Sequence, residues 1–157
     1  MAAKTVTLDK PVPAFSLPST GGADWSIKDA AGSKLVLYFY PRDNTPGCTQ
    51  EGSDFGAQYA AFRKAGAIVL GVSADSLESH ERFKAKMKFP FELLADTDQK
   101  VCKLFAVIQE KSMYGRKFLG IERSTFLIDG KGFLRQEWRK VKVPGHAAAV
   151  LTSVRSL

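Results

Sequence analysis

Cys48 is the residue whose surroundings most strongly suggest chemistry. It ends the segment 41–48, Pro-Arg-Asp-Asn-Thr-Pro-Gly-Cys, which follows the apolar run 35–40 and precedes a helical pattern. A cysteine at the start of a helix faces backbone N–H groups that have no intrahelical acceptor, and these groups favour a thiolate over a thiol. Because the thiolate is the nucleophilic form, the sequence predicts that Cys48 is a reactive cysteine rather than a packed sulfur.

Length and composition indicate a soluble globular protein. The chain has 157 residues, of which 45% are hydrophobic and 25% are charged, and these values predict a single domain over residues 1–157. No apolar stretch approaches the roughly 20 residues of a transmembrane helix. The first nine residues also lack the apolar core of a signal peptide. We therefore expect a cytoplasmic protein that does not insert into a membrane.

The residues that could hold a metal ion are few and scattered. The two cysteines lack the spacing of a metal site, and the two histidines, His80 and His146, have no second ligand near them in the sequence. We therefore predict no metal and no other cofactor. The net charge of +7 and the basic clusters 84–88 and 139–142 could suit nucleic acid. A solvated basic surface is favoured, because no recognised nucleic-acid motif accompanies the charge.

The hydrophobic pattern places Cys48 in an alternating series of strands and helices. It predicts strands at 35–40 and 68–72, helices at 48–65 and 77–87, a short element at 93–95, a helix carrying residues 101–108, a hairpin at 124–138 and a final helix from 144 onward. Residues 113–119 are interpreted as a loop. This order implies parallel strands joined by crossovers and then an antiparallel hairpin. We therefore expect an α/β, thioredoxin-like fold, with a mixed central β-sheet, flanking helices and an N-terminal extension.

Segment 41–48 resembles the active-site signature of the peroxiredoxins: proline, three residues, threonine, two residues, cysteine. Further segments, at 49–51, 94–96, 110–112 and 120–129, are similar to the bacterioferritin-comigratory, or PrxQ, branch of that family. The resemblance extends from about residue 12 to residue 138. It implies a thiol-dependent peroxidase that reduces hydrogen peroxide and organic hydroperoxides through a cysteine sulfenic acid. It also implies a thiol reductant, such as thioredoxin or glutaredoxin with glutathione, and points to a monomer.

The resemblance assigns a role to each residue of the site. Cys48 would be the peroxidatic cysteine, Thr45 would exchange hydrogen bonds with the peroxide, and Arg123 would place a cation near the sulfur and the developing oxyanion. Pro41 would shield the pocket from water, and Glu51 would hold Arg123 or a neighbouring backbone group. Simpler alternatives remain open for these residues. Thr45 could be only a turn residue and Pro41 only a strand terminator. Arg123 could be a surface cation, and Glu51 could be a first-turn helix carboxylate.

The chain departs from the family pattern at the cysteine that normally resolves the sulfenic acid. Many members carry it five residues after the first cysteine, and others carry it in the next helix, but these positions are Ser53 and Lys84 here. Cys102 is a possible but disfavoured resolving residue. Its apolar helical surroundings favour a small packed side chain, and nothing in the sequence brings it within the roughly 7 Å between Cα atoms that a disulfide needs. We therefore predict a one-cysteine mechanism with an external thiol, and inactivation by over-oxidation at high peroxide.

Two other functions are consistent with parts of the pattern. A thioredoxin-like disulfide oxidoreductase would share the fold, but it would need a Cys-x-x-Cys pair that the sequence lacks. A non-catalytic module would bind nucleic acid through its basic residues, or would act as a redox sensor that passes oxidation to a partner.

Overall fold

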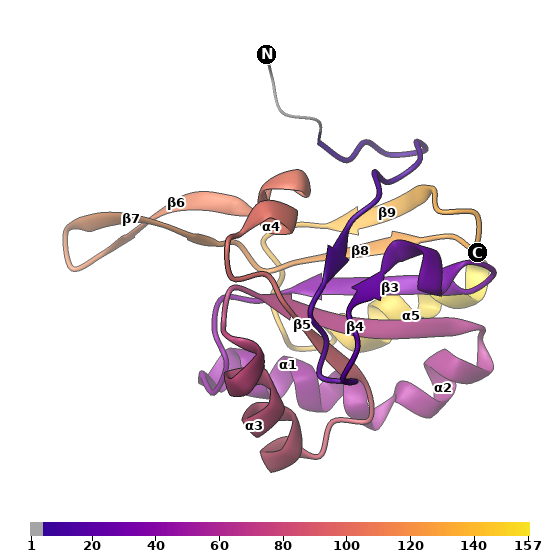
Figure 1. The fold of residues 1–157 in the computed structure, drawn as a ribbon, viewed down its shortest axis with the longest axis horizontal. Helices are drawn as coiled ribbons and strands as arrows, with labels where there is room; N and C mark the ends of the chain where they lie inside the picture. Colours follow the sequence, from indigo (N-terminus) through magenta and orange to yellow (C-terminus); the bar gives the residue numbers. More distant parts are fainter. Residues whose placement is uncertain (1–4) are drawn as a thin grey trace.

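A computed structural model describes residues 5–157, and a five-stranded β-sheet forms its centre (Figure 1). The strand order is β5-β4-β3-β8-β9. The strands are β3 (Lys34–Phe39), β4 (Ala67–Ser73), β5 (Glu92–Ala95), β8 (Ser124–Ile128) and β9 (Leu134–Trp138). β3 and β4 pair in parallel, as do β4 and β5, whereas β8 is antiparallel to both β3 and β9. The predicted mixed sheet of the thioredoxin-like class is confirmed.

Strand β3 divides the core into two layers. Its residues Leu35, Leu37 and Phe39 belong to one hydrophobic cluster, and Val36 and Tyr38 belong to the other. Successive side chains of a strand point to opposite faces, so the two clusters lie on opposite sides of the sheet. Because both faces are covered, the strand is apolar throughout instead of alternating with polar residues.

Four helices cover the face of Val36 and Tyr38, as their buried residues show. They are α1 (Pro46–Ala57), α2 (Tyr59–Lys64), α3 (Leu77–Met87) and α5 (His146–Ser156). The predicted helix 48–65 is therefore two helices, which meet at Gln58. Among the helices of residues 5–157, none combines the length and the apolar character needed to cross a bilayer.

The opposite face is covered by the N-terminal extension and by one short helix (Figure 1). These elements are β1 (Ser16–Leu17), β2 (Trp25–Ser26), the 3-10 helix η1 (Ile27–Ala30) and α4 (Lys100–Leu104). The prediction that a helix would continue to Ile108 is wrong. Ala106 adopts a left-handed conformation with φ of 55°, which a right-handed helix cannot contain.

A separate hairpin projects from the body of the protein (Figure 1). It consists of β6 (Ile108–Met113) and β7 (Arg116–Ile121), which pair only with each other among the described strands. Tyr114 and Gly115 connect them, with φ values of 52° and 77°. Two central residues with positive φ form the tight turn that matches the twist of a hairpin. Residues 113–119, interpreted as a loop from the sequence, therefore form the end of this hairpin.

Candidate active site

Cys48 lies in the first turn of α1, as its position after the strand predicted. Thr45 is the N-cap residue, with extended backbone angles, and Pro46 is the first helical residue. The N–H groups of a first helical turn have no intrahelical acceptor and form the positive end of the helix dipole. The Cys48 side chain is buried, with 2% of the residue exposed. Its sulfur is therefore held beside a positive helix terminus and largely apart from bulk water.

Arg123 supplies a positive charge directly at this sulfur. Its Nη2 donates to Cys48 Sγ at 3.5 Å, although the two residues are 75 positions apart in the chain. Arg123 stands two residues after β7 and immediately before β8, which pairs with β3. A Cβ atom on Gly47 would lie 3.0 Å from Arg123 Nη2, so the glycine leaves room for the guanidinium against the helix terminus.

Glu51 holds Arg123 from one turn further along α1. Its Oε1 accepts a hydrogen bond from Arg123 Nη1 at 2.7 Å, and its carboxylate is almost fully buried. Among the described residues, its Oε2 has no hydrogen-bond partner. Burial raises the pKa of Glu51 to about 7, against the opposing pull of the Arg123 charge. Of the two interactions expected from the sequence, the structure shows the contact with Arg123.

Thr45 and Pro41 lie half-buried in the loop before α1. The Thr45 hydroxyl donates to the Arg42 carbonyl oxygen at 2.9 Å, which orients it and leaves its oxygen lone pairs available as acceptors. Pro41 stands two residues after Phe39, the last residue of β3. The structure thus places both predicted residues in the loop that leads to Cys48.

A buried anchor that was not predicted from the sequence lies beneath this loop. Asp43 accepts from the Tyr40 hydroxyl at 2.7 Å, and its Oδ2 lies 2.7 Å from His80 Nδ1. The other ring nitrogen of His80 lies 2.9 Å from the Leu94 carbonyl oxygen. Burial raises the pKa of Asp43, but the His80 and Tyr40 hydrogen bonds outweigh it and the net pKa is lowered. The anchor fastens the loop to α3 and β5.

His80 is therefore not an isolated histidine. No local pattern predicts its contact with Asp43, since the two residues are 37 positions apart. Asp75 joins them, accepting from the Asp43 backbone N–H at 2.8 Å and from the Ser73 hydroxyl at 2.5 Å. The three possible ligand atoms of Asp43, Asp75 and His80 lie within 4.8 Å of one another. They are engaged in hydrogen bonds that hold the loop, and we assign them no metal.

Lys111 is a second cation whose pKa reflects the charges of the site, and it was not predicted from the sequence. It lies on β6 and is half-buried. Burial and then the charge of Arg123 lower its pKa, whereas Cys48 and Glu122 act in the opposite direction.

Cys102 occupies a different environment on the other side of the sheet. It is fully buried in the cluster of Leu35, Leu37 and Phe39, whereas Cys48 belongs to the cluster of Val36 and Tyr38. Both cysteines are free thiols. Since a disulfide needs Cα atoms within about 7 Å, a bond between them would require one cysteine to leave its layer.

A negative charge, and not a positive one, lies beside Cys102. Asp96 Oδ2 accepts from the Cys102 backbone N–H at 2.6 Å, and Asp96 is itself fully buried. Burial raises the pKa of the Cys102 thiol, and the Asp96 carboxylate raises it further. Cys102 is therefore held as a neutral thiol.

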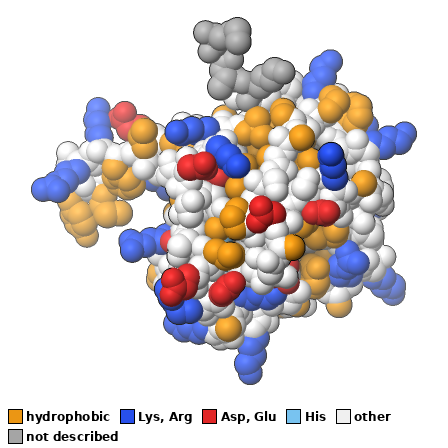
Figure 2. All heavy atoms as spheres, in the orientation of Figure 1, with side chains coloured by type: hydrophobic (Ala, Val, Ile, Leu, Met, Phe, Trp, Pro, Cys, Tyr) orange, Lys and Arg blue, Asp and Glu red, His pale blue; other side chains and the backbone are white. Residues whose placement is uncertain are grey.

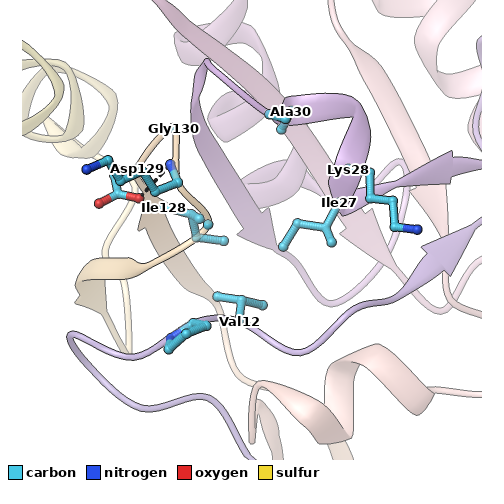
Figure 3. Close-up of a pocket in the computed structure, with 11 residues that line it drawn as sticks. Val12, Ile27, Lys28, Ala30, Ile128, Asp129 and Gly130 are labelled. Carbon is cyan, nitrogen blue, oxygen red and sulfur yellow. Dashed lines mark hydrogen bonds between the residues drawn. The ribbon is translucent and has the colours of Figure 1, made fainter.

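A pocket of about 230 Å³ lies at the opposite end of β8 from Arg123. Figure 3 shows the side chains of Val12, Ile27 and Ile128 converging on it. None of the residues around Cys48 lines this pocket. It is therefore separate from the candidate active site.

Comparison with known proteins agrees with the geometry around Cys48. The model of the AhpC/TSA family matches residues 8–137. Peroxiredoxin Bcp of Xanthomonas campestris pv. campestris is 52% identical over 151 residues, which cover 95% of this chain and 94% of the relative. Peroxiredoxin Bcp of Bacillus subtilis is 42% identical over 153 residues, which cover 98% of each chain.

Solved structures show the same relationship. Peroxiredoxin Q of Xanthomonas campestris superposes with a TM-score of 0.86, at 53% identity and 90% coverage of both chains. A cysteine-to-serine variant of PrxQ from Xylella fastidiosa superposes with a TM-score of 0.91, at 42% identity and 98% coverage of both chains. The chain therefore belongs to the AhpC/TSA family and is a peroxiredoxin of the Bcp, or PrxQ, group, which makes it a thiol peroxidase.

Proposed function

We propose that this peroxiredoxin reduces hydrogen peroxide and organic hydroperoxides through a sulfenic acid on Cys48. The observation that carries the proposal is the cation of Arg123, with Nη2 3.5 Å from Cys48 Sγ at the start of a helix. A relative supports the organic substrates. The solved complexes of the Xanthomonas campestris bacterioferritin comigratory protein, 52% identical to this chain, concern its alkyl peroxide reduction activity.

The reaction begins with attack of the Cys48 thiolate on one peroxide oxygen. An S–O bond forms and the O–O bond breaks, so that the sulfur is oxidised by two electrons to a sulfenic acid. The other oxygen leaves as hydroxide or alkoxide and takes a proton to give water or an alcohol. Negative charge therefore moves from the sulfur to the leaving oxygen, and we assign to Arg123 an interaction with both.

Positioning and charge stabilisation must supply most of the acceleration. A free thiol of pKa about 8.5 is only about 3% ionised at pH 7, so complete ionisation would raise the rate by at most roughly 30-fold. Enzymes typically accelerate their reactions by roughly 10⁶-fold or more. The remainder is attributed to alignment of the peroxide and to charge stabilisation by fixed donors.

We assign these tasks to the residues around Cys48. The Thr45 hydroxyl, oriented by the Arg42 carbonyl oxygen, would accept from the peroxide. The Arg123 guanidinium would stabilise the leaving oxygen, and Glu51 would fix its orientation through the 2.7 Å ion pair. Pro41 would restrict the entry of water to the pocket.

We further propose a one-cysteine mechanism in which an external thiol reduces the sulfenic acid. The support is the location of Cys102 on the opposite face of the sheet from Cys48. A yeast mitochondrial 1-Cys peroxiredoxin, 25% identical with a TM-score of 0.81, is described as resolved through glutathione and thioredoxin systems. Thioredoxin, or glutaredoxin with glutathione, is accordingly the reductant class that we propose. Action as a cytoplasmic monomer of one domain stays a prediction.

A single-turnover experiment tests the proposed function. Reduced protein is mixed with hydrogen peroxide or tert-butyl hydroperoxide, and peroxide loss is followed against oxidation of Cys48. We expect one equivalent of either peroxide to be consumed without added thiol, and continuous turnover once dithiothreitol is present. Reduction of insulin disulfides with no consumption of peroxide would instead identify a disulfide oxidoreductase.

A further inference from the structure

The β6–β7 hairpin exposes four large apolar side chains. Met113 is 58% exposed, Tyr114 97%, Phe118 43% and Leu119 70%. Figure 2 shows hydrophobic and basic side chains side by side on the lobe that this hairpin forms. Contiguous exposed apolar surface rimmed by polar groups marks interaction sites in soluble proteins.

The two faces of the hairpin are distinguishable by their register. Met113 lies opposite Arg116, and Lys111 lies opposite Phe118, so these four side chains share one face. We call this set the inner face. The outer face carries the alternating residues Glu110, Ser112, Lys117 and Leu119, with Lys117 paired to Glu110 at 3.6 Å.

The base of the hairpin adjoins the active site. A Cβ atom on Gly120 would lie 3.3 Å from both the Lys111 side chain and the Phe118 ring, so these two groups pack together over the glycine. The charge of Arg123 lowers the pKa of Lys111, and Cys48 acts on it in the opposite direction. Strand β7 ends two residues before Arg123. The hairpin therefore leads at its base to Arg123, whose Nη2 lies 3.5 Å from Cys48 Sγ.

We propose that the inner face docks the protein that reduces Cys48, a thiol protein with an apolar surface and an acidic rim around its reactive cysteine. This inference depends on the proposed one-cysteine function, which requires an external thiol to reach Cys48. The charge of the inner face selects the partner, because the strand residues on that face include Lys111 and Arg116 and no acidic residue. The same charge disfavours a second copy of this chain, whose net charge is +7. A small-molecule thiol, in contrast to a thiol protein, would not need an exposed apolar surface such as the inner face.

Reduction of the Cys48 sulfenic acid in the docked complex uses two thiols of the partner. The first, as a thiolate, attacks the Cys48 sulfur; the S–O bond breaks, and the departing hydroxide takes a proton to form water. The second attacks the partner's own sulfur in the mixed disulfide and releases Cys48 as a thiolate. The partner is oxidised by two electrons, and the sulfenic acid is reduced by two.

The two faces provide a matched experiment. The inner-face variant carries Phe118→Ser with Arg116→Glu, and the outer-face control carries Leu119→Ser with Lys117→Glu. Each variant thus loses one large apolar side chain and reverses one positive charge. The thioredoxin system (thioredoxin, thioredoxin reductase and NADPH) serves as the probe, and dithiothreitol serves as a reductant that needs no docking. Oxidation of Cys48 by hydrogen peroxide is measured separately, so that a failure of the peroxidase proposal is recognised on its own.

We expect the inner-face variant to lose at least tenfold in kcat/KM for thioredoxin, and the outer-face control to stay within twofold of wild type. Oxidation by peroxide and turnover with dithiothreitol should change in neither variant. Higher ionic strength should slow wild-type reduction by thioredoxin more than it slows that of the inner-face variant.

Several results would overturn the proposal. Equal effects in the two variants would show that only the total charge matters. Reduction of the wild-type protein by glutathione alone, at least as fast as by thioredoxin, would remove the need for a docked protein. A wild-type dimer that the inner-face variant breaks would assign the face to a second copy. Binding to phosphatidylserine vesicles that is lost only in the inner-face variant, with reduction by thioredoxin unchanged, would assign it to a membrane.

Discussion

Cys48 and Cys102 are both buried, with exposed fractions of 2% and 0%, yet their surroundings are opposite. The Cys48 sulfur lies 3.5 Å from an arginine nitrogen at the start of a helix. Cys102 lies beside the buried carboxylate of Asp96, which accepts from its backbone N–H at 2.6 Å. The central sheet separates the two sites.

The contrast shows that burial alone does not distinguish a reactive cysteine from an inert one. Removal from water disfavours a thiolate in either position. At Cys48 a cation and the first turn of a helix lie beside the sulfur, whereas at Cys102 burial and then Asp96 raise the pKa of the thiol. Four predictions test this difference, in order of decreasing expected effect.

Replacement of each cysteine by serine should give the largest difference in activity between the two positions. We expect Cys48→Ser to lower peroxide reduction with dithiothreitol by roughly 10³-fold or more, since the nucleophile is lost. Cys102→Ser should stay within about twofold once it is folded, because its sulfur takes no part in the reaction. Loss of turnover in Cys102→Ser, with normal oxidation of Cys48, would show that Cys102 resolves the sulfenic acid after all.

Removal of the Arg123 cation should lower the reactivity of Cys48 towards that of Cys102. We expect Arg123→Met to lower the rate of Cys48 oxidation by about 10²- to 10³-fold, because a fixed charge at the reacting atoms is lost. Arg135→Met is the control, since Arg135 pairs with Asp9 and Asp129 away from the site. Stopped-flow measurement of the oxidation step distinguishes the two variants, and equal rates would exclude Arg123 from the reaction.

The buried Glu51 should make the free energy of unfolding depend on pH. Its folded pKa of about 7 lies above its ordinary value of 4.5, so between these values the native state binds more protons than the unfolded state. The free energy of unfolding should therefore fall as the pH rises through this range, by up to about 1.4 kcal/mol per pH unit. Glu51→Gln should lack this component.

Urea denaturation of both proteins at a series of pH values measures the difference. Subtraction of the Glu51→Gln curve isolates Glu51 from the other titrating groups, among them His146, whose pKa burial lowers to about 4. A difference that does not change with pH, or that increases with pH, would contradict the protonation of Glu51 in the folded protein.

Neutralising the charge beside Cys102 should have the smallest effect on reactivity. We expect Asp96→Asn to lose about 1–2 kcal/mol of unfolding free energy, because a buried charged acceptor of two backbone N–H groups is replaced. Cys102 should still resist alkylation in the native state, since burial is the larger cause of its raised pKa. Rapid alkylation of native Asp96→Asn would show that the charge, and not burial, protects this thiol.

The sequence predicted the elements whose packing leaves a local pattern. The apolar run of β3 and the helical spacing in α3 each correspond to a face that the core covers. The location of Cys48 at the start of a helix followed from the change of pattern after Pro41. Glu51 and Arg123 were expected to meet only because of the family resemblance, since no local pattern connects positions 72 residues apart.

Other parts left no such pattern. The β6–β7 hairpin buries little of either face, so its strands show no clear alternation of polar and apolar residues. Its turn, formed by Tyr114 and Gly115, was its one local signal. The Asp43–His80 anchor joins a loop to a helix, and only the assembled fold brings these residues together.

The intact mass of the reduced protein after one equivalent of hydrogen peroxide tests the contrast between Cys48 and Cys102 most directly. A one-cysteine mechanism predicts a gain of about 16 Da for a sulfenic acid, or about 32 Da after a second oxidation, located on Cys48. A loss of about 2 Da would mean a disulfide between Cys48 and Cys102. That result would contradict the separation of the two cysteines by the sheet, and an unchanged mass would contradict the peroxidase activity itself.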